Sequence, residues 1–366
     1  MLKKICFLAF FLFLIPFSLG AQERNTEQAD KIFKARVSEI LEEKEVGGEK
    51  EEAVQQKLEL EILEGDKKGE TVIYNGIGDI VVADNQVYKK GDKVLAAAIS
   101  DHEGNVSYYV TDYVRSPALW WLFGLFVLAL LLVGRFKGFK ALLALALTFF
   151  IIIKFIIPGI LGGANALLIT ILGSFLILLA VIYITEGFKE LSHLSVASIF
   201  ASLLLVFFIS WFFTKIAYLT GLSGENILPL ISLGEKSINF QGLLLAGILI
   251  GSLGVLDDVV VSQVATVKEI VETDPYQQRI EIFKKSYRVG VSHISSMVNT
   301  LFLAYAGVSL PLLILFISGG SAFPSWWHII NNEAVATEIV RTLAGSLGII
   351  LSVPLSTTLA VWWYKR

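Results

Sequence analysis

The sequence predicts a multi-pass α-helical membrane protein with a small all-β domain ahead of its membrane part. Three observations lead to this fold class. Of the 366 residues, 55% are apolar, above the roughly 45–50% that is usual for soluble domains. The apolar residues gather in long blocks after residue 116. Residues 22–115 instead hold 21 acidic and 13 basic side chains, so an acidic polar module precedes an apolar one.

The first 21 residues have the layout of a secretory signal peptide. Two lysines open it, an apolar run from Ile5 to Phe17 follows, and small residues lead up to Ala21. We therefore expect residues 22–115 to form an extracytoplasmic domain, which leaves residues 116–366 as the membrane domain.

The extracytoplasmic module has the pattern of short strands. Apolar residues alternate with polar ones, and turn signals such as Asn75-Gly76 separate the runs. A Glu/Lys-rich insert from Glu42 to Gln56 is expected to be a solvated loop or an exposed helix. The expected strands contain Phe33 to Val37, Leu58 to Ile62, Val72 to Tyr74, Ile80 to Val82, Val94 to Ala98 and Tyr108 to Val110.

The membrane domain contains seven apolar segments that are long enough, or nearly long enough, to cross a hydrocarbon core, which needs about 20 helical residues. A small β-barrel or sandwich followed by about seven spans is therefore the expected architecture. The segments are 118–134, 140–158, 165–186, 195–217, 242–261, 290–317 and 338–363.

The basic residues predict the orientation of these spans. If the β-rich module lies outside, nearly all loop lysines and arginines fall on the cytoplasmic side, many of them in a basic loop at about 262–289. The tryptophans then fall at the predicted helix ends, where their rings favour the membrane interface. We expect a bacterial cell-membrane protein in contact with the lipid bilayer, with its carboxyl end in the cytoplasm.

Composition argues against several other classes of protein. The acidic module would repel a phosphate backbone, so nucleic acid is not an expected partner. Cys6 is the only cysteine, and the four histidines are far apart, so neither a metal site nor a cofactor is expected.

Two carboxylates interrupt the fifth apolar segment. Asp257 and Asp258 lie between Leu256 and three valines, where a charge costs about 2.5–3.5 kcal/mol on insertion scales. Asp258 and Ser262 share a helix face because they are four residues apart. Intramembrane carboxylates often mark proton or ion paths, although these two could also meet water at the inner interface.

The sixth segment begins with polar residues on the same predicted cytoplasmic side. His293, Ser296 and Thr300 share one face, and Asn299 lies on the adjoining face. Such residues either join helices by hydrogen bonds or belong to a path that includes the aspartates. We include all four among the candidate path residues.

The seventh segment begins with residues expected to have a structural role. Glu338 and Arg341 have the i, i+3 spacing of an ion pair, although Arg341 could instead reach another helix. The polar pair Asn332 and Glu333 comes just before this segment. Small residues that permit close helix packing are Gly247, Gly251 and Gly348.

Three blocks together resemble the YibE/F-like family of bacterial multi-pass membrane proteins. The blocks are Gly251-Ser-Leu-Gly-Val-Leu-Asp257-Asp-Val-Val-Val-Ser-Gln, Met297-Val-Asn299-Thr-Leu-Phe-Leu-Ala-Tyr-Ala-Gly307, and Asn332-Glu333 with Glu338-Ile-Val-Arg341-Thr-Leu-Ala-Gly-Ser-Leu-Gly348. The resemblance covers the mature chain and implies its fold and location. It carries no assigned biochemical activity, and it matches the family's aspartate to Asp257 or Asp258, of which we prefer Asp257.

Two functions from different classes follow from these observations. The first is a transporter or exporter of unknown substrate, with proton coupling through the intramembrane carboxylates as its expected mechanism. The alternative is a non-transporting assembly protein that binds a protein partner through its exported β-domain or its cytoplasmic loop. An enzyme is not expected, because an aspartyl protease needs carboxylates from two helices and no other span carries an aspartate.

Overall fold

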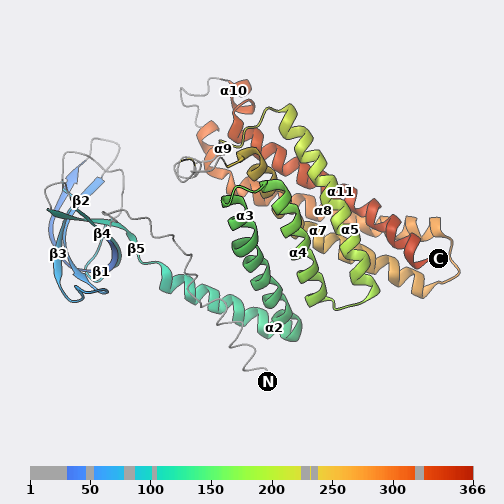
Figure 1. Cartoon of the computed structure of the whole chain (residues 1–366), viewed down its shortest axis with the longest axis horizontal. Helices are drawn as coiled ribbons and strands as arrows, with labels where there is room; N and C mark the ends of the chain where they lie inside the picture. The colour runs from blue at the N-terminus through green and yellow to red at the C-terminus, as the bar shows by residue number, and fades with distance from the viewer. Residues whose placement is uncertain are drawn as a thin grey trace. The chain divides into compact units, whose positions relative to one another are not determined.

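The computed structural model describes residues 31–46, 53–77, 87–100, 105–223, 231, 238–317 and 325–365 (Figure 1). The expected signal peptide and the expected strand from Ile80 to Val82 lie outside these residues. The chain divides into two compact units, a β-rich one and a helical one.

The β-rich unit is a closed barrel of five strands in the order β1-β2-β3-β5-β4. Neighbouring strands are antiparallel except β3 and β5, which pair in parallel. The all-β prediction is confirmed. The strands are β1 (Lys31–Val46), β2 (Ala53–Ile62), β3 (Thr71–Asn75), β4 (Lys93–Ser100) and β5 (Val106–Tyr113).

Alternation along the strands builds the barrel core. Leu58 and Leu60 on β2 are fully buried, as are Val94 and Ala96 on β4, because residues two apart point to the same face of a strand. Strand β1 closes the barrel, because it pairs with β2 on one side and, over residues 31–36, with β4 on the other.

The prediction for the insert from Glu42 to Gln56 was wrong in its secondary structure. Strand β1 continues to Val46 and β2 begins at Ala53, and Glu42 pairs with Lys57 across the two strands. The β1 side chains in this extension are exposed, as expected for a solvated segment, but the segment is a strand and not a loop. Cross-strand pairing to β2 supplies the backbone hydrogen bonds that a charge pattern does not reveal.

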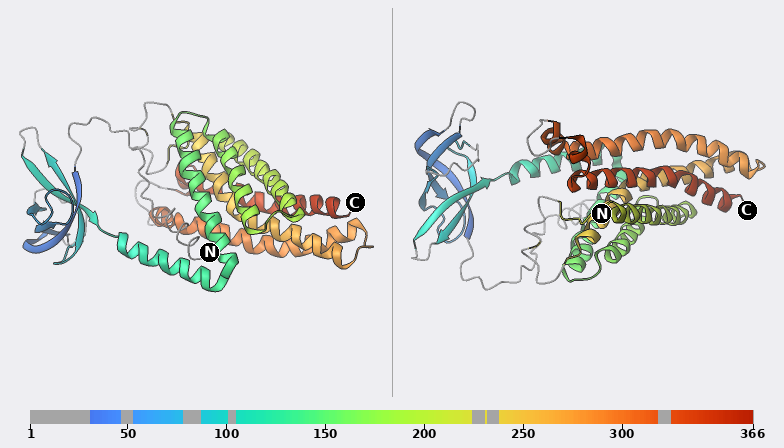
Figure 2. Two further views of the ribbon diagram at one scale, coloured as in Figure 1. Left: turned by 60° about the horizontal axis from the view of Figure 1, so that its bottom comes forward. Right: turned by 90° about the horizontal axis from the view of Figure 1, so that it is seen from above.

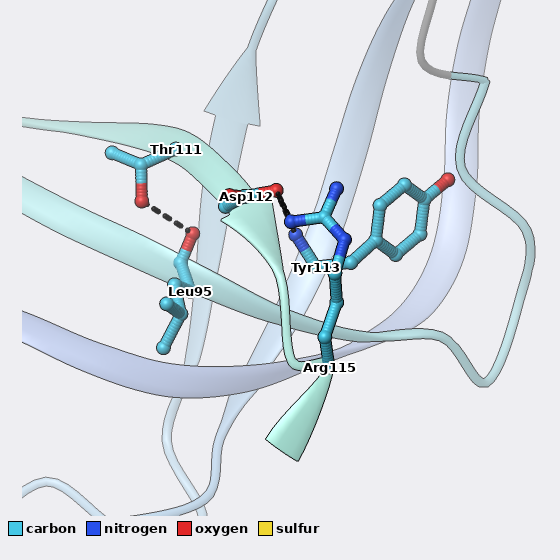
Figure 3. Close-up of polar contacts among 5 residues, drawn as sticks. All are labelled: Leu95, Thr111, Asp112, Tyr113 and Arg115. Atoms are coloured by element: carbon cyan, nitrogen blue, oxygen red, sulfur yellow. Dashed lines mark hydrogen bonds and ion pairs between the residues drawn. The ribbon is translucent and has the colours of Figure 1, made fainter. Parts of the chain in front are cut away.

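Polar contacts fasten the last strand of the barrel (Figure 3). The Thr111 hydroxyl donates to the Leu95 carbonyl oxygen at 3.2 Å, which joins β5 to β4. Asp112 accepts a hydrogen bond from the Tyr113 backbone N–H at 2.8 Å and forms an ion pair with Arg115. The Arg115 guanidinium and this N–H lower the pKa of the Asp112 carboxyl.

The helical unit provides five helices that are long and apolar enough to cross a membrane, which indicates a multi-pass membrane protein. The first stretch has 46 residues and contains two of the expected segments, 118–134 and 140–158. Arg135 has a non-helical φ of 47° inside it and marks a kink between the two segments. This stretch comprises α2 (Ser116–Ile151), the π-helix η1 (Ile152–Ile156) and α3 (Ile157–Leu161); the other four are α4 (Ala166–Thr185), α5 (Glu190–Ile216), α7 (Phe240–Thr273) and α11 (Glu333–Tyr364).

The expected sixth segment, 290–317, is divided between two helices. Helix α8 (Arg279–Val308) runs beside α7 and α11, and α9 (Leu310–Ile317) follows it, with Pro311 at its second position. Neither is among the five candidate spans, since α8 is not apolar enough and α9 has only 8 residues. A short helix α10 (Trp326–Ile330) precedes α11.

Helix α7 is the centre of the helical unit and packs against α4, α5, α8 and α11. Helices α7 and α11 run parallel, because Gln263 bonds Thr357 near their carboxyl ends and Ser252 lies beside Gly345 nearer their amino ends. Figure 2 shows α8 and α11 side by side along their lengths. The buried apolar side chains at these contacts form one continuous core.

Candidate functional site

The two aspartates lie midway along α7 but differ in their surroundings. The Asp257 side chain is half-buried and Asp258 is exposed, because adjacent helix positions point about 100° apart. The charges that interact with Asp257 are those of Asp258 and of Glu186, which follows α4. Within the described residues, neither aspartate has a hydrogen bond or an ion pair. Asp257 is therefore a half-buried carboxylate on a candidate span, without a neutralising partner among the described residues.

Gln263, two turns beyond Asp257, joins three helices. Its side-chain amide is buried and donates to the Ser286 carbonyl oxygen of α8 at 2.9 Å and to the Thr357 hydroxyl of α11 at 2.7 Å. Sequence reasoning did not single out this residue. The available signal was an amide inside an apolar helix, where an unpaired amide would be costly.

The close approach of α8 at this point depends on Gly290. A β-carbon there would lie 2.4 Å from the Val353 Cγ1 atom and 2.7 Å from the Gln263 Oε1 atom. Only a glycine leaves room for the three-helix contact. Gly290 was also missed as a packing residue.

Serine and threonine side chains fill much of the helix interfaces. We call this set the polar interior, and each member is 8% exposed or less. It consists of Thr170, Ser174, Ser195, Ser198, Ser202, Ser210, Thr214, Ser252, Thr342, Ser346, Ser352, Ser356 and Thr357.

Part of the polar interior lies between α5 and α11. Val206 of α5 meets Gly348 of α11, where a β-carbon would lie 2.1 Å from the Val206 Cγ2 atom. The end of α5 also meets the start of α11, so the two helices are antiparallel. One and two turns from the Val206 contact, α5 carries the buried Ser202 and Ser198, and α11 carries the buried Ser352 and Ser356.

Several hydroxyls of the polar interior have no hydrogen-bond partner among the described residues. They are Thr170, Ser174, Ser195, Ser198, Ser210, Thr214 and Ser346. Serine and threonine in helices commonly bond to the carbonyl oxygen four residues earlier, as Ser202 does to Ser198 at 2.8 Å. Buried polar groups without such a bond usually take water or an ion.

The structure does not bring the polar start of the sixth segment to the aspartates. His293, Ser296, Asn299 and Thr300 on α8 are all exposed. Among the described residues none of them bonds to either aspartate, and the Thr300 hydroxyl donates to the Ser296 carbonyl oxygen of its own helix at 2.9 Å. Ser262, which shares a face with Asp258, is half-buried, and its backbone carbonyl oxygen accepts a hydrogen bond from the Thr266 hydroxyl at 2.8 Å.

The residues at the start of α11 form an ion pair, a helix cap and a loop contact. Arg341 donates to Glu338 at 2.8 Å within the helix. Asn332 caps α11 by accepting from the Ala334 backbone N–H at 3.0 Å. The Glu333 carboxylate accepts from the Thr220 hydroxyl at 2.8 Å and from both backbone N–H groups of 220–221, so it anchors the loop after α5.

The predicted packing glycines behave differently from one another. Gly348 makes the closest approach, to Val206. A β-carbon on Gly251 would lie 2.6 Å from the Tyr305 hydroxyl oxygen. Gly247 has no atom within 4 Å of that position, so its predicted contact is not found in the described part of the chain.

Residues 122–366 match the YibE/F-like protein model, and residues 26–113 match the model of the YibE/F family N-terminal domain. The chain belongs to the YibE/F-like family. The β-barrel matches the N-terminal domain model, and the match to the YibE/F-like protein model begins within the kinked α2. No curated protein and no solved structure matches the chain.

The site of this YibE/F-like protein is chemically simple. It offers one half-buried carboxylate, buried hydroxyls and one buried amide. No group of three or more His, Cys, Asp or Glu side chains that could hold a metal occurs in the described residues. Such an arrangement is suited to proton transfer and to binding water or a small ion.

Proposed function

We propose that the chain is a membrane transporter in which protons reach or leave the carboxylate of Asp257. The observation that carries this proposal is the set of unpartnered hydroxyls in the polar interior. A bundle that served only as an anchor would be more stable with apolar side chains at these positions, since each unpaired buried hydroxyl costs about 1–3 kcal/mol in protein mutational data.

The carboxylates supply a site where a proton can bind. Asp257 is half-buried in α7, and the charge of Glu186, at the end of α4, acts on it. A proton that reaches Asp257 through water held by the polar interior could pass on toward Glu186. This route uses α4, α5, α7 and α11 and does not use the polar face of α8.

The orientation is part of the same proposal. Seven crossings, with 118–134 and 140–158 as separate spans and α8 with α9 as the sixth, would leave the barrel outside and Lys365 inside. The basic residues support this arrangement because they gather at the ends that would lie in the cytoplasm. Asp257 would then lie in the inner half of the membrane.

Proton flux into proteoliposomes tests the function directly. Protein reconstituted in vesicles with a pH-sensitive dye inside would be given an outward or inward proton gradient. We expect wild-type protein to dissipate the gradient, and Asp257→Asn to abolish that activity. Asp258→Asn should have the smaller effect, because Asp258 is exposed on a different flank of α7.

The matched control is Glu272→Gln, which also removes one carboxylate from α7, at its exposed end beside Lys268. This variant should keep wild-type flux. Full flux in the Asp257→Asn, Asp258→Asn double variant would show that the carboxylates do not carry protons. Absence of flux in wild-type protein under both gradients would count against transport of protons altogether.

A second candidate function is partner binding by the exported barrel. Ile32 on β1 and Tyr109 on β5 flank Ala97 of β4 on the outer surface and are 63% and 47% exposed. Ile32 and Tyr109 thus lie on the two strands either side of β4, and exposed apolar side chains that gather in one patch mark protein-binding surfaces. Cross-linking from this face in intact cells should capture a partner in wild-type protein and lose it in Ile32→Ser, Tyr109→Ser.

A further inference from the structure

Helix α8 carries a continuous polar face that is open on the protomer. The exposed members of this face are Ser292, His293, Ser295, Ser296, Asn299 and Thr300. The proposed proton route does not use them, so their presence needs a separate explanation.

The contacts of α8 place this face at membrane depth. Gly290, at one end, packs against Val353 in the middle of α11, and Leu301, at the other end, packs against Gly345. One turn further, the Tyr305 hydroxyl lies over Gly251 of α7. The polar face therefore lies beside the central turns of two candidate spans, well away from their ends.

Lipid tails cannot form hydrogen bonds with the polar side chains of this α8 face. The Ser292 hydroxyl donates to the Val289 carbonyl oxygen at 2.6 Å, and Thr300 bonds within the helix too. The amide of Asn299 and the ring of His293 have no such bond among the described residues, and an unpaired amide in hydrocarbon costs several kcal/mol. A protein surface or water must cover this side of α8.

We propose that the α8 face of a second copy of this chain covers it, so that the protein is a dimer whose twofold axis runs along the membrane normal. The face has hydroxyls and an amide, which donate and accept, and it has no acidic or permanently charged side chain. It is therefore complementary to itself and offers nothing to a charged partner helix. Two copies in one membrane have the same orientation, so identical patches meet across such an axis.

Asn299 is the residue whose substitution tests the proposed dimer interface best. Asparagine amides hydrogen-bond across helices in membranes, with energies of about 1–2 kcal/mol in model peptides. Near a twofold axis each Asn299 side chain would reach its own counterpart. The interface is independent of the proton route, because it uses none of the residues assigned to that route.

Disulfide cross-linking in native membranes tests the proposal. The sequence is convenient because Cys6 is the only cysteine, so Cys6→Ser gives a cysteine-free background. In that background, Asn299→Cys should form covalent homodimers under mild oxidation. Leu176→Cys, an exposed position on α4, is the matched control and should not.

A second measurement keeps the test independent of cysteine chemistry. Mass photometry of purified full-length protein should give a dimer, and Asn299→Leu should weaken dimerisation by about 5- to 30-fold, as expected for the loss of one or two kcal/mol. Asn299→Gln should restore most of it. Monomeric wild-type protein with no Asn299→Cys cross-link above the Leu176→Cys control, or a cross-link only to a different protein, would overturn the proposal.

Discussion

The barrel and the helical bundle of this chain place polar and apolar side chains in opposite ways. In the barrel, Leu58 and Leu60 are fully buried while charged side chains cover the outside. In the bundle, Ser198 and Ser202 are fully buried while large apolar side chains such as Phe208 are exposed. The difference follows from the surroundings, because lipid does not drive apolar side chains inward and close packing of small residues joins helices instead.

The largest effect should come from removing apolar volume in the barrel. Leu60→Ala deletes a fully buried side chain and should lower the free energy of unfolding by about 2–5 kcal/mol. Hydrogen exchange of β2 amides in full-length protein would measure the loss. Ile73→Ala, at an exposed position of the adjacent strand, should change the protection little. Equal losses in both variants would mean that the barrel interior does not dominate its stability.

In the bundle the reverse change should be the harmful one, because added volume separates the helices. Gly348→Ala puts a β-carbon 2.1 Å from the Val206 Cγ2 atom, and overpacking of this kind costs about 1–3 kcal/mol. Thermal unfolding of the protein in detergent would measure this loss of stability. Gly247→Ala is the control, since no atom lies within 4 Å of its β-carbon. If Gly348→Ala is as stable as Gly247→Ala, α5 and α11 are not held by close approach.

The polar bonds between helices should contribute less than this packing. Gln263→Leu removes two hydrogen bonds, to α8 and to α11, and should destabilise the bundle by about 1–2 kcal/mol. Thr357→Val removes one of the two and should have roughly half the effect. Thermal unfolding under the same conditions gives the comparison. An increase in stability on Gln263→Leu would show that this amide is retained for a reason other than holding the three helices together.

The sequence predicts the two regions with unequal success, and the reasons are physical. Period-two alternation identified β2 and β4 because each strand buries one face. Hydropathy identified the apolar blocks because the hydrocarbon core sets their length. It did not reveal that α8 is too polar to be counted as a candidate span, or that its polar residues point away from the rest of the protomer.

The sequence singled out only some residues of the candidate site. Asp257 drew attention because a carboxylate stands out among valines and leucines. Gln263 and Gly290 were missed because their roles exist only where three helices cross, and crossings depend on contacts between residues far apart in the sequence. Ser198 and Ser202 were missed for the same reason, since serine is common on exposed and buried helix faces alike.

The smallest expected effect is the dependence of the barrel on acid. The Arg115 guanidinium and the Tyr113 backbone N–H lower the pKa of Asp112 below its ordinary value of 3.8. A carboxyl whose pKa is lowered by folding adds stability that is fully present above the ordinary value and is lost as pH falls through the lowered one. Protection of β5 amides, corrected for intrinsic exchange, should therefore stay constant from pH 7 to about 5 and decline below about 4.

Asp112→Asn should flatten part of that decline, and the change should be small because the Asp112–Arg115 pair is exposed to solvent. Asp66→Asn, in the turn after β2, is the control; Asp66 has no ion pair among the described residues. If both variants flatten the curve equally, acid acts through the net charge of the barrel and not through the contact in Figure 3. The same comparison in Glu64→Gln would extend the test, because Lys34 lowers the pKa of Glu64 in the same way.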